Sequence, residues 1–496
     1  MTKKQPRRPT RRPSAATAPL PPILYAARGS AAQKRLARLK KLGRIRAVGP
    51  RLYVSVTASQ TARTLREAWS DVVANLFPEA LLSHRTALEF QPGPQGEVVI
   101  TGTTNRKLRY PGLVLDFVRG PAPLADDPPF LSLRSSSLAR AFLENLSTRG
   151  RDPARTLARE ALEARLERIL HSGGEAELQR IRDRAREIAD ELGWKSPFKH
   201  LDVLIGTLLG TRKGAVTSDV ARARAAGEPF DATRVERFSR LFGELRNPVV
   251  EVRDTFAARD HARNKAFFEA YFSNYIEGTT FEIEEAEEIV FDKKIPAARP
   301  ADADDIVGTF ELVSDAAEMR TTPETFDAFL RILRARHATM MSRRPEAEPG
   351  RFKTRPNRAG DSEFVHPDYV IGTLRKGFEM YRDVRKGLPR AIFMMFLVAE
   401  VHPFVDGNGR AARIMMNAEL ASQGLTTIII PTVYRDDYVT ALRALTRRDR
   451  PAPLVTALAR AHRFSHLEFA PYRATLDELT RRNWFREPDD ARIVAD

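Results

Sequence analysis

The chain has 496 residues, 42% of them hydrophobic, which is enough for about two to four domains with substantial cores. It contains no cysteine, so disulfides, thiolate zinc sites and cysteine nucleophiles are excluded, and we expect a reducing compartment, the cytoplasm. No apolar run approaches the roughly 18 residues of a membrane-spanning helix, and the N-terminus lacks the apolar core of a signal peptide, so we expect no membrane association.

The positive charge is concentrated at the N-terminus. The first 66 residues hold 17 Lys plus Arg and no Asp or Glu, whereas the rest of the chain holds 64 of each sign. A neutral body with a basic head indicates a polyanionic partner, and we expect residues 1–66 to bind DNA, largely through phosphate. Within this head, the Pro- and Arg-rich residues 1–22 predict a disordered basic tail.

Residues 23–60 carry the pattern of a winged-helix-like segment. Ser30 can cap a helix from Ala31 to Leu42 with an apolar stripe ending at Leu42, and Arg44 to Val48 and Arg51 to Val54 read as two short strands. This order resembles the N-terminal module of AbiEi-type antitoxin regulators. Only Ile23 to Arg28 remains for the helices that precede such a module, so a complete helix-turn-helix stays open.

Basic side chains in this segment are the candidate DNA contacts: Lys34, Arg35, Arg38, Lys41, Arg44, Arg46 and Arg51. The alternative is a solvated basic head that attracts any polyanion weakly. Because winged-helix regulators often dimerise on palindromic sites, a homodimer is also open.

Residues 61–147 predict a small α/β domain without catalytic function. We expect a helix over Glu67 to Leu76 and strands over Glu97 to Thr101, Leu113 to Val118 and Phe130 to Leu133. Residues 148–250 predict a helical connector, because charges of opposite sign recur four residues apart. Its segment Gly210 to Pro229 is polar and predicts a loop.

An amphipathic helix near residue 270 carries two polar residues on one face. Ser273 and Glu277 are one turn apart, and Gly278 is a natural helix stop. By itself this pattern is also typical of an ordinary solvated Glu before a helix end. Further along, Asn357 to Gly360 is rich in turn formers between short extended arms, which predicts a surface hairpin.

Residues 402–413 carry the densest chemistry of the chain. An apolar run from Arg390 to Val401 predicts a buried helix, which Pro403 should end. Gly407-Asn408-Gly409 allows positive φ and leads into a second helix over Ala411 to Ser422, whose N-terminus attracts anions.

The residue types of this loop suit nucleotide chemistry. His402 can accept a proton near neutral pH, and Asp406 is a hard oxygen ligand for Mg²⁺. Arg410 and Arg413 offer planar guanidiniums to phosphate oxygens. Phe404 should point into the core and anchor the loop.

The loop resembles the Fic family, whose pattern His-x-Phe-x-Asp/Glu-Gly-Asn-Gly/Lys-Arg-x-x-Arg is matched at every fixed position. The resemblance implies transfer of AMP from ATP to a hydroxyl of a target protein, with His402 as base and Asp406 holding Mg²⁺. It implies that the 407–409 backbone and Arg410 bind the α- and β-phosphates and that Arg413 reaches the γ-phosphate. The full set of expected nucleotide-site residues is Phe404, Gly407, Asn408, Gly409, Arg410, Arg413 and Tyr438.

Ser273 to Gly278 is similar to the family's inhibitory motif, Ser/Thr-x-x-x-Glu-Gly/Asn. This resemblance implies that Glu277 pairs with Arg413 and keeps it from the γ-phosphate, without a separate antitoxin chain. The resemblance to the Fic family also implies that the hairpin within residues 350–367 is a flap that pairs with the target backbone. Tyr438 either borders the adenine pocket or packs in the core.

We therefore predict a mainly α protein. A helical Fic core with a small β-hairpin flap (251–470) follows the basic segment, the small α/β unit and the connector, and a C-terminal tail (471–496) ends the chain. We expect an autoinhibited protein adenylyltransferase that uses ATP and Mg²⁺. Two alternatives remain open: removal of AMP by the same site, with Glu277 positioning water, or a DNA-binding regulator or toxin–antitoxin component that senses nucleotide.

Overall fold

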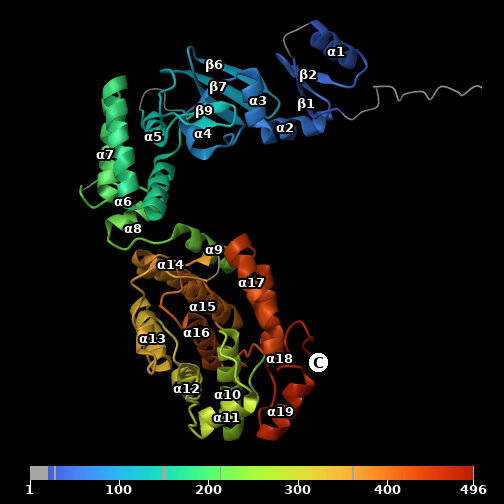
Figure 1. Cartoon of the computed structure of the whole chain (residues 1–496), viewed down its shortest axis with the longest axis vertical. Coiled ribbons are helices and arrows are strands. Elements are labelled where there is room, and N and C mark those ends of the chain that lie inside the picture. The colour runs from blue at the N-terminus through green and yellow to red at the C-terminus, as the bar shows by residue number, and fades with distance from the viewer. Residues whose placement is uncertain (1–19, 27–29, 148–151, 213, 360–361, 495–496) are drawn as a thin grey trace, which may run out of the picture. The chain divides into compact units, whose positions relative to one another are not determined.

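The computed structural model describes residues 20–26, 30–147, 152–212, 214–359 and 362–494. The tail predicted over residues 1–22 lies almost wholly outside these ranges. The chain divides into two compact units after Arg222, within the stretch predicted as a connector, and each unit is considered by itself. Helices dominate the chain, as the mainly α prediction required (Figure 1).

The basic N-terminal segment forms a helix and a three-stranded antiparallel sheet of order β1-β3-β2. Its elements are β1 (Ile23–Tyr25), α1 (Ser30–Lys41), β2 (Arg46–Gly49) and β3 (Leu52–Val54). The helix and the β2–β3 hairpin lie where the sequence predicted them. The residues left for preceding helices instead form β1, which pairs with β3. Leu36 is buried, but Leu42 is 59% exposed because the helix ends one residue before it, so its place in the apolar stripe was wrong.

A six-stranded mixed sheet of order β6-β7-β5-β4-β9-β8 follows. Its elements and the helices around it are α2 (Ala58–Glu67), α3 (Trp69–Leu76), β4 (Leu81–Leu82), α4 (His84–Glu89), β5 (Glu97–Gly102), β6 (Arg106–Tyr110), β7 (Leu113–Arg119), β8 (Pro129–Phe130), β9 (Leu133–Ser135) and α5 (Leu138–Leu146). Buried side chains of β3 share one core with α2, α3 and this sheet. The basic segment is therefore packed onto the α/β unit.

Two predicted elements of this region were wrong in detail. The helix predicted over Glu67 to Leu76 is α3, which begins two residues later at Trp69, and the separate helix α2 before it was not predicted. The strand predicted over Phe130 to Leu133 is the turn between β8 and β9, because Leu131 has a positive φ of 56° that ends the extended run. Strand β6 was missed since its Arg106-Lys-Leu-Arg-Tyr sequence is charged, as an exposed edge strand tolerates.

Helices α6 (Arg159–Leu192) and α7 (Lys195–Leu208) follow in the first unit, and α8 (Asp219–Ala225) spans the boundary at Arg222. Helix α6 is two helices joined at Gly174, whose φ of 70° and ψ of −177° interrupt the helical ladder. Helix α8 lies inside Gly210 to Pro229, so the loop predicted there was wrong. Buried side chains of α4 to α7 form a core of their own.

The second unit is a helical assembly built around one apolar helix. Its larger elements are α9 (Ala232–Glu244), α10 (Arg259–Ile276), α11 (Ile283–Phe291), α12 (Pro300–Val313), α13 (Phe326–Met340), β10 (Arg358–Ala359), β11 (Ser362–Glu363), α14 (Val370–Asp383), α15 (Leu388–Val401), α16 (Asn408–Ser422), α17 (Arg435–Arg448), α18 (Ala452–Phe464) and α19 (Tyr472–Arg481). Four 3₁₀ turns join them: η1 (Glu318–Arg320), η2 (Pro345–Ala347), η3 (Pro367–Tyr369) and η4 (Thr432–Tyr434).

Helix α15 lies in the middle of this unit, with α13 and α14 on one side and α17 and α18 on the other (Figure 1). From Ile392 to Val398 every residue of α15 is buried, as expected for a helix apolar on all faces. Helix α16 packs along it. The loop between these two helices is thereby fixed to the best-packed part of the unit.

The segment predicted as a C-terminal tail packs into this core. Trp484, just after α19, is fully buried in the same cluster as the α15 side chains. Among the described residues, every helix is too short or too polar to cross a bilayer.

Candidate active site

The 402–413 loop is a tight connection between α15 and α16. Helix α15 ends at Val401, and His402 takes the left-handed conformation with φ of 54° ahead of Pro403. Gly407 has φ of 72° and caps α16, which starts at Asn408, one turn before the predicted Ala411. The Asn408 side chain accepts from the Phe404 N–H at 2.8 Å and donates to the Phe404 carbonyl at 2.9 Å, which closes the loop.

Phe404 supports the loop from the side of the hydrophobic core. Its side chain is fully buried, so it anchors the loop, and its ring stacks on His337 with centroids 3.7 Å apart. His337 Nδ1 accepts from the Gly350 N–H at 2.9 Å, so Nε2 carries the proton and donates to the Asp406 carbonyl at 3.0 Å. Nothing in the sequence around His337 singles it out. Only the fold brings it under the loop.

His402 is held as a neutral imidazole. Its ring stacks on Phe364 with centroids 3.6 Å apart, and Nδ1 lies 3.3 Å from the Ala399 carbonyl. Burial lowers the pKa of His402 to about 4, and the charge of Lys353 acts in the same direction. With the proton on Nδ1, Nε2 is left with a lone pair, which is the form that a general base requires.

Arg410 is held by buried partners that the sequence did not indicate. It donates to the Asn274 Oδ1 at 3.1 Å and pairs with Asp305 of α12 at 2.6 Å. The Asp406 carboxylate lies 3.8 Å from its other nitrogen. Burial raises the pKa of Asp305 despite this contact. In sequence, Asp305 is one of three aspartates within four residues, so nothing singles it out.

Asp406 fits a magnesium ligand. Its side chain is 52% exposed, unlike the buried arginine beside it. Its Oδ1 accepts from the Gly407 N–H at 2.6 Å, and its Oδ2 lies 3.8 Å from Arg410 and 3.9 Å from Arg344, beyond direct hydrogen-bond distance. Mg²⁺ commonly takes one or two protein carboxylates and completes its shell with phosphates and water, so a single carboxylate beside a phosphate cradle suits it.

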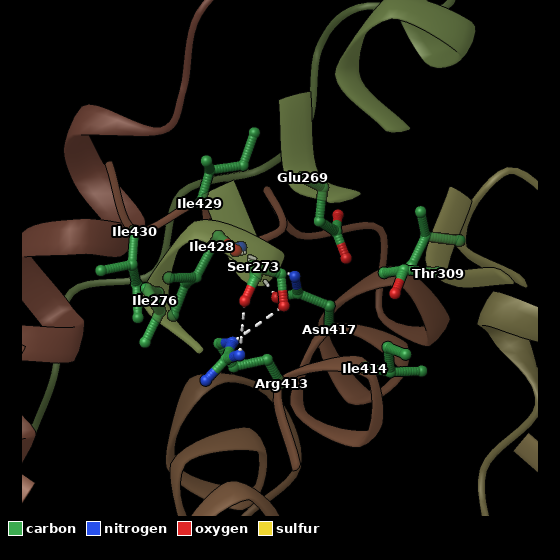
Figure 2. A pocket seen from close by; sticks show the side chains of 11 residues that line it. Glu269, Ser273, Ile276, Thr309, Arg413, Ile414, Asn417, Ile428, Ile429 and Ile430 are labelled. Carbon is green, nitrogen blue, oxygen red and sulfur yellow. Dashed lines mark hydrogen bonds between the residues drawn. The ribbon is translucent and has the colours of Figure 1, made fainter. Parts of the chain in front are cut away.

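Arg413 is bound by the two residues of the Ser273–Glu277 face. It donates to the Ser273 hydroxyl at 2.9 Å and carbonyl at 2.8 Å, as Figure 2 shows, and to Glu277 Oε1 at 2.7 Å. Glu277 caps the end of α10, and Gly278 follows it with φ of 97°. The Glu277 carboxylate also packs closely against the first turn of α16 at Gly409. The approach is so close that a Cβ atom at this position would overlap with the carboxylate.

Tyr438 packs in the core beside Arg413. It is 3% exposed, and its hydroxyl lies 3.5 Å from the Met395 sulfur. Burial raises its pKa. Of the two roles that the sequence left open, packing is the one this position suits.

The predicted hairpin forms, with β10 paired to β11. Its Gly360 lies outside the described residues. The Lys353 N–H donates to the Pro403 carbonyl at 2.9 Å, and Lys353 Nζ donates to Asn357 Oδ1 at 2.6 Å. Asn357 donates in turn to the Phe404 carbonyl at 2.9 Å, so the base of the flap is bonded to the loop. Lys353 was not foreseen. Burial lowers its pKa to about 7.

The candidate DNA contacts lie on α1 and around the β2–β3 hairpin. Lys34, Arg35, Arg38 and Lys41 are exposed on α1. Arg46 and Arg51 are exposed as well, and they donate to the Thr61 hydroxyl at 2.6 Å and to the Leu76 carbonyl at 3.4 Å. Arg44 is partly buried.

Residues 327–420 match the model of the Fic/DOC family, and the chain therefore contains a Fic domain. The matched span runs from α13 through the flap to α16, so it includes the whole 402–413 loop and excludes α10.

Several similar proteins are named protein adenylyltransferases. The protein adenylyltransferases fic-1 of Caenorhabditis briggsae and Caenorhabditis elegans are 22% and 23% identical to this chain over 237 residues, 47% of this chain and 47% of each relative. A Fido domain-containing protein of Dictyostelium discoideum is 32% identical over 95 residues, 18% of this chain and 66% of its own. The solved structure of Caenorhabditis elegans Fic-1 covers 65% of this chain and 94% of its own at 19% identity, with a TM-score of 0.37. The chain spans about half the length of the fic-1 relatives.

Proposed function

We propose that the chain is an autoinhibited protein adenylyltransferase that transfers AMP from ATP to a hydroxyl of a target protein. One observation carries the proposal. The neutral imidazole of His402, the half-exposed carboxylate of Asp406 and the guanidiniums of Arg410 and Arg413 lie on one loop and the helix turn after it. The Glu277 carboxylate of the same chain is paired with Arg413. The names of the fic-1 relatives support the reaction type.

The proposed reaction needs one base and a phosphate cradle. His402 Nε2 takes the proton of the target hydroxyl while that oxygen attacks the α-phosphorus of ATP. The bond from the α-phosphorus to the bridging oxygen breaks, and pyrophosphate leaves. The N–H groups at the start of α16 and the Arg410 guanidinium bind the phosphates. Asp406 would hold Mg²⁺, which when bound neutralises phosphate charge and orients the leaving group.

Inhibition follows from competition for Arg413. The guanidinium that would bind the γ-phosphate already donates to Glu277, and the same carboxylate lies over Gly409 where phosphate oxygens would approach. A carboxylate there repels phosphate and must leave before ATP can bind productively. Removal of AMP from a modified target, with Glu277 positioning water, would use the same residues and is separated by experiment.

The test is automodification with labelled ATP and Mg²⁺. We would compare the wild type, Glu277→Gly, and Glu277→Gly combined with His402→Ala. We expect label in the single mutant to exceed the wild type by at least about tenfold, which needs only ~1.4 kcal/mol of relief, and the double mutant to be unlabelled. Equal label in all three would refute both the inhibition and the base. No label in any, with release of AMP from a modified protein, would favour AMP removal.

We further propose that the N-terminal head binds duplex DNA. The exposed basic face of α1 supports this, because Lys34, Arg35, Arg38 and Lys41 project from one helix beside a β-hairpin. Phosphate contacts of this kind give affinity without sequence reading.

A further inference from the structure

One cavity of the second unit lies away from the 402–413 loop, and no residue of this loop lines it. It has a volume of about 400 Å³. Its walls are the segment before α10, the first half of α10, the η1 turn and the C-terminal end of α16. A volume of this size suits a small organic molecule.

One residue of the cavity wall, His261, carries a buried donor without a partner. His261 is 2% exposed, and its Nδ1 accepts from the Phe469 N–H at 2.9 Å, so the proton stands on Nε2. That Nε2 has no hydrogen-bond partner among the described residues, and the nearest carboxylate, Asp254, is 3.9 Å away. A buried N–H without a partner costs about 1–3 kcal/mol, which a ligand acceptor would recover.

Two cations stand near this donor. Lys265 is 7% exposed and pairs with Asp254 at 2.6 Å, which uses one of its three N–H bonds. Arg320 lies exposed at the end of η1 and also lines the cavity. The charge of Asp254 is thus balanced by Lys265 within the wall of the cavity. The N–H groups that remain, on His261, Lys265 and Arg320, favour an anionic ligand. Burial raises the pKa of Glu269 to about 7, so this carboxyl opposes a bound anion only in part.

The rest of the lining is mostly apolar. It consists largely of alanines with four larger side chains, Phe256, Val313, Met319 and Leu425. A phosphate or a dicarboxylate would leave most of its oxygens without donors here, which is costly in an apolar surrounding. A single carboxylate on an apolar body matches both the donors and the walls.

We propose that this cavity binds a small organic monocarboxylate, with its oxygens against His261 Nε2 and Lys265 and its apolar body against Phe256 and Met319. The inference is independent of the proposed AMP transfer, because it concerns different residues and is read out by binding.

Benzoate is the probe and benzamide its neutral control of equal size. We expect calorimetry on the full chain to give benzoate binding at least tenfold tighter than benzamide, with a rise in Tm for benzoate alone. Equal binding of the two, or no binding of benzoate, would overturn the proposal.

Two variants locate the site. Ala262→Phe places a ring from an exposed position of α10 into the cavity and should abolish benzoate binding without loss of the fold. His261→Phe removes the buried donor while keeping an aromatic ring at this position, and it should weaken binding at least tenfold. Arg331→Gln, an exposed arginine of α13 that does not line the cavity, is the matched control and should bind as the wild type does. Undiminished binding by Ala262→Phe would place the ligand elsewhere and refute the site.

Discussion

At the scale of single residues, the state of His402 decides the pH dependence of the proposed reaction. A free histidine would lose its basic form below its ordinary value of 6.5, whereas burial moves the pKa of His402 to about 4. The imidazole is therefore already neutral at pH 6 and remains so at pH 7. We expect automodification by Glu277→Gly to change less than about twofold between pH 6 and pH 7. A loss that follows a group with pKa near 6.5 would contradict this assignment.

Buried histidines also set the acid stability of the protein. The pKa values of His337 and His462 are lowered to about 4 by burial, and His462 Nε2 accepts from the Val252 N–H at 2.8 Å. The unfolded chain takes up these protons near pH 6.5, while the folded chain resists until about pH 4. Their contribution is thus full above pH 6.5 and is lost as the pH falls toward 4.

We expect the free energy of unfolding, measured by urea titration, to fall steadily between pH 6.5 and pH 4.5. His462→Gln keeps an acceptor for Val252 without a titrating group and should reduce this slope. His200→Gln, at an exposed histidine, should leave it unchanged. A slope insensitive to His462→Gln would mean that carboxylates alone control acid stability.

At the scale of elements, the flap is bonded to the catalytic loop through one side chain. Asn357 accepts from Lys353 and donates to the Phe404 carbonyl, so Asn357→Ala removes both bonds. In the Glu277→Gly background we expect KM for a target protein to rise at least fivefold and KM for ATP to change less than twofold. Arg355→Ala, an exposed residue of the same segment, is the control. An equal rise in both KM values would show that Asn357 supports the nucleotide site instead.

The elements that the sequence predicted well are those with a strong local cause. The apolar run of α15 favours a buried helix, Pro403 ends it, and Gly407 permits the positive φ that precedes α16, so the loop between α15 and α16 was foreseen. The hairpin after α1 was foreseen for the same reason. Strand β6 was missed because an exposed edge strand carries no apolar pattern.

The partners of the site could not be predicted in the same way. Asp305, His337 and Lys353 come from three separate segments and meet the loop only after the chain has folded. Their sequence surroundings are ordinary for a helix start, a helix end and a loop. A sequence motif identifies the residues of the loop itself. The residues that position this loop are identified only by their tertiary contacts.

At the scale of the whole molecule, we expect the basic head and the Fic unit to have separable functions. Replacing Lys34, Arg35, Arg38 and Lys41 with Gln should weaken binding of a duplex DNA at least tenfold and flatten its dependence on salt. The same replacements in the Glu277→Gly background should leave automodification unchanged. Fluorescence anisotropy at several salt concentrations measures the first and labelled ATP the second. Unaltered DNA binding would remove α1 from the interface.

Helix α10 carries the proposed inhibitory residue and is also part of the scaffold. Glu277 caps its C-terminal end, while its Ser273 accepts from Arg413 and its Asn274 accepts from Arg410. A truncation that deletes α10 would leave Arg413 without its Ser273 and Glu277 acceptors and would leave Arg410 with Asp305 as its close partner. We therefore expect the proposed inhibition to be relieved by changing the Glu277 side chain and not by proteolytic or genetic removal of α10.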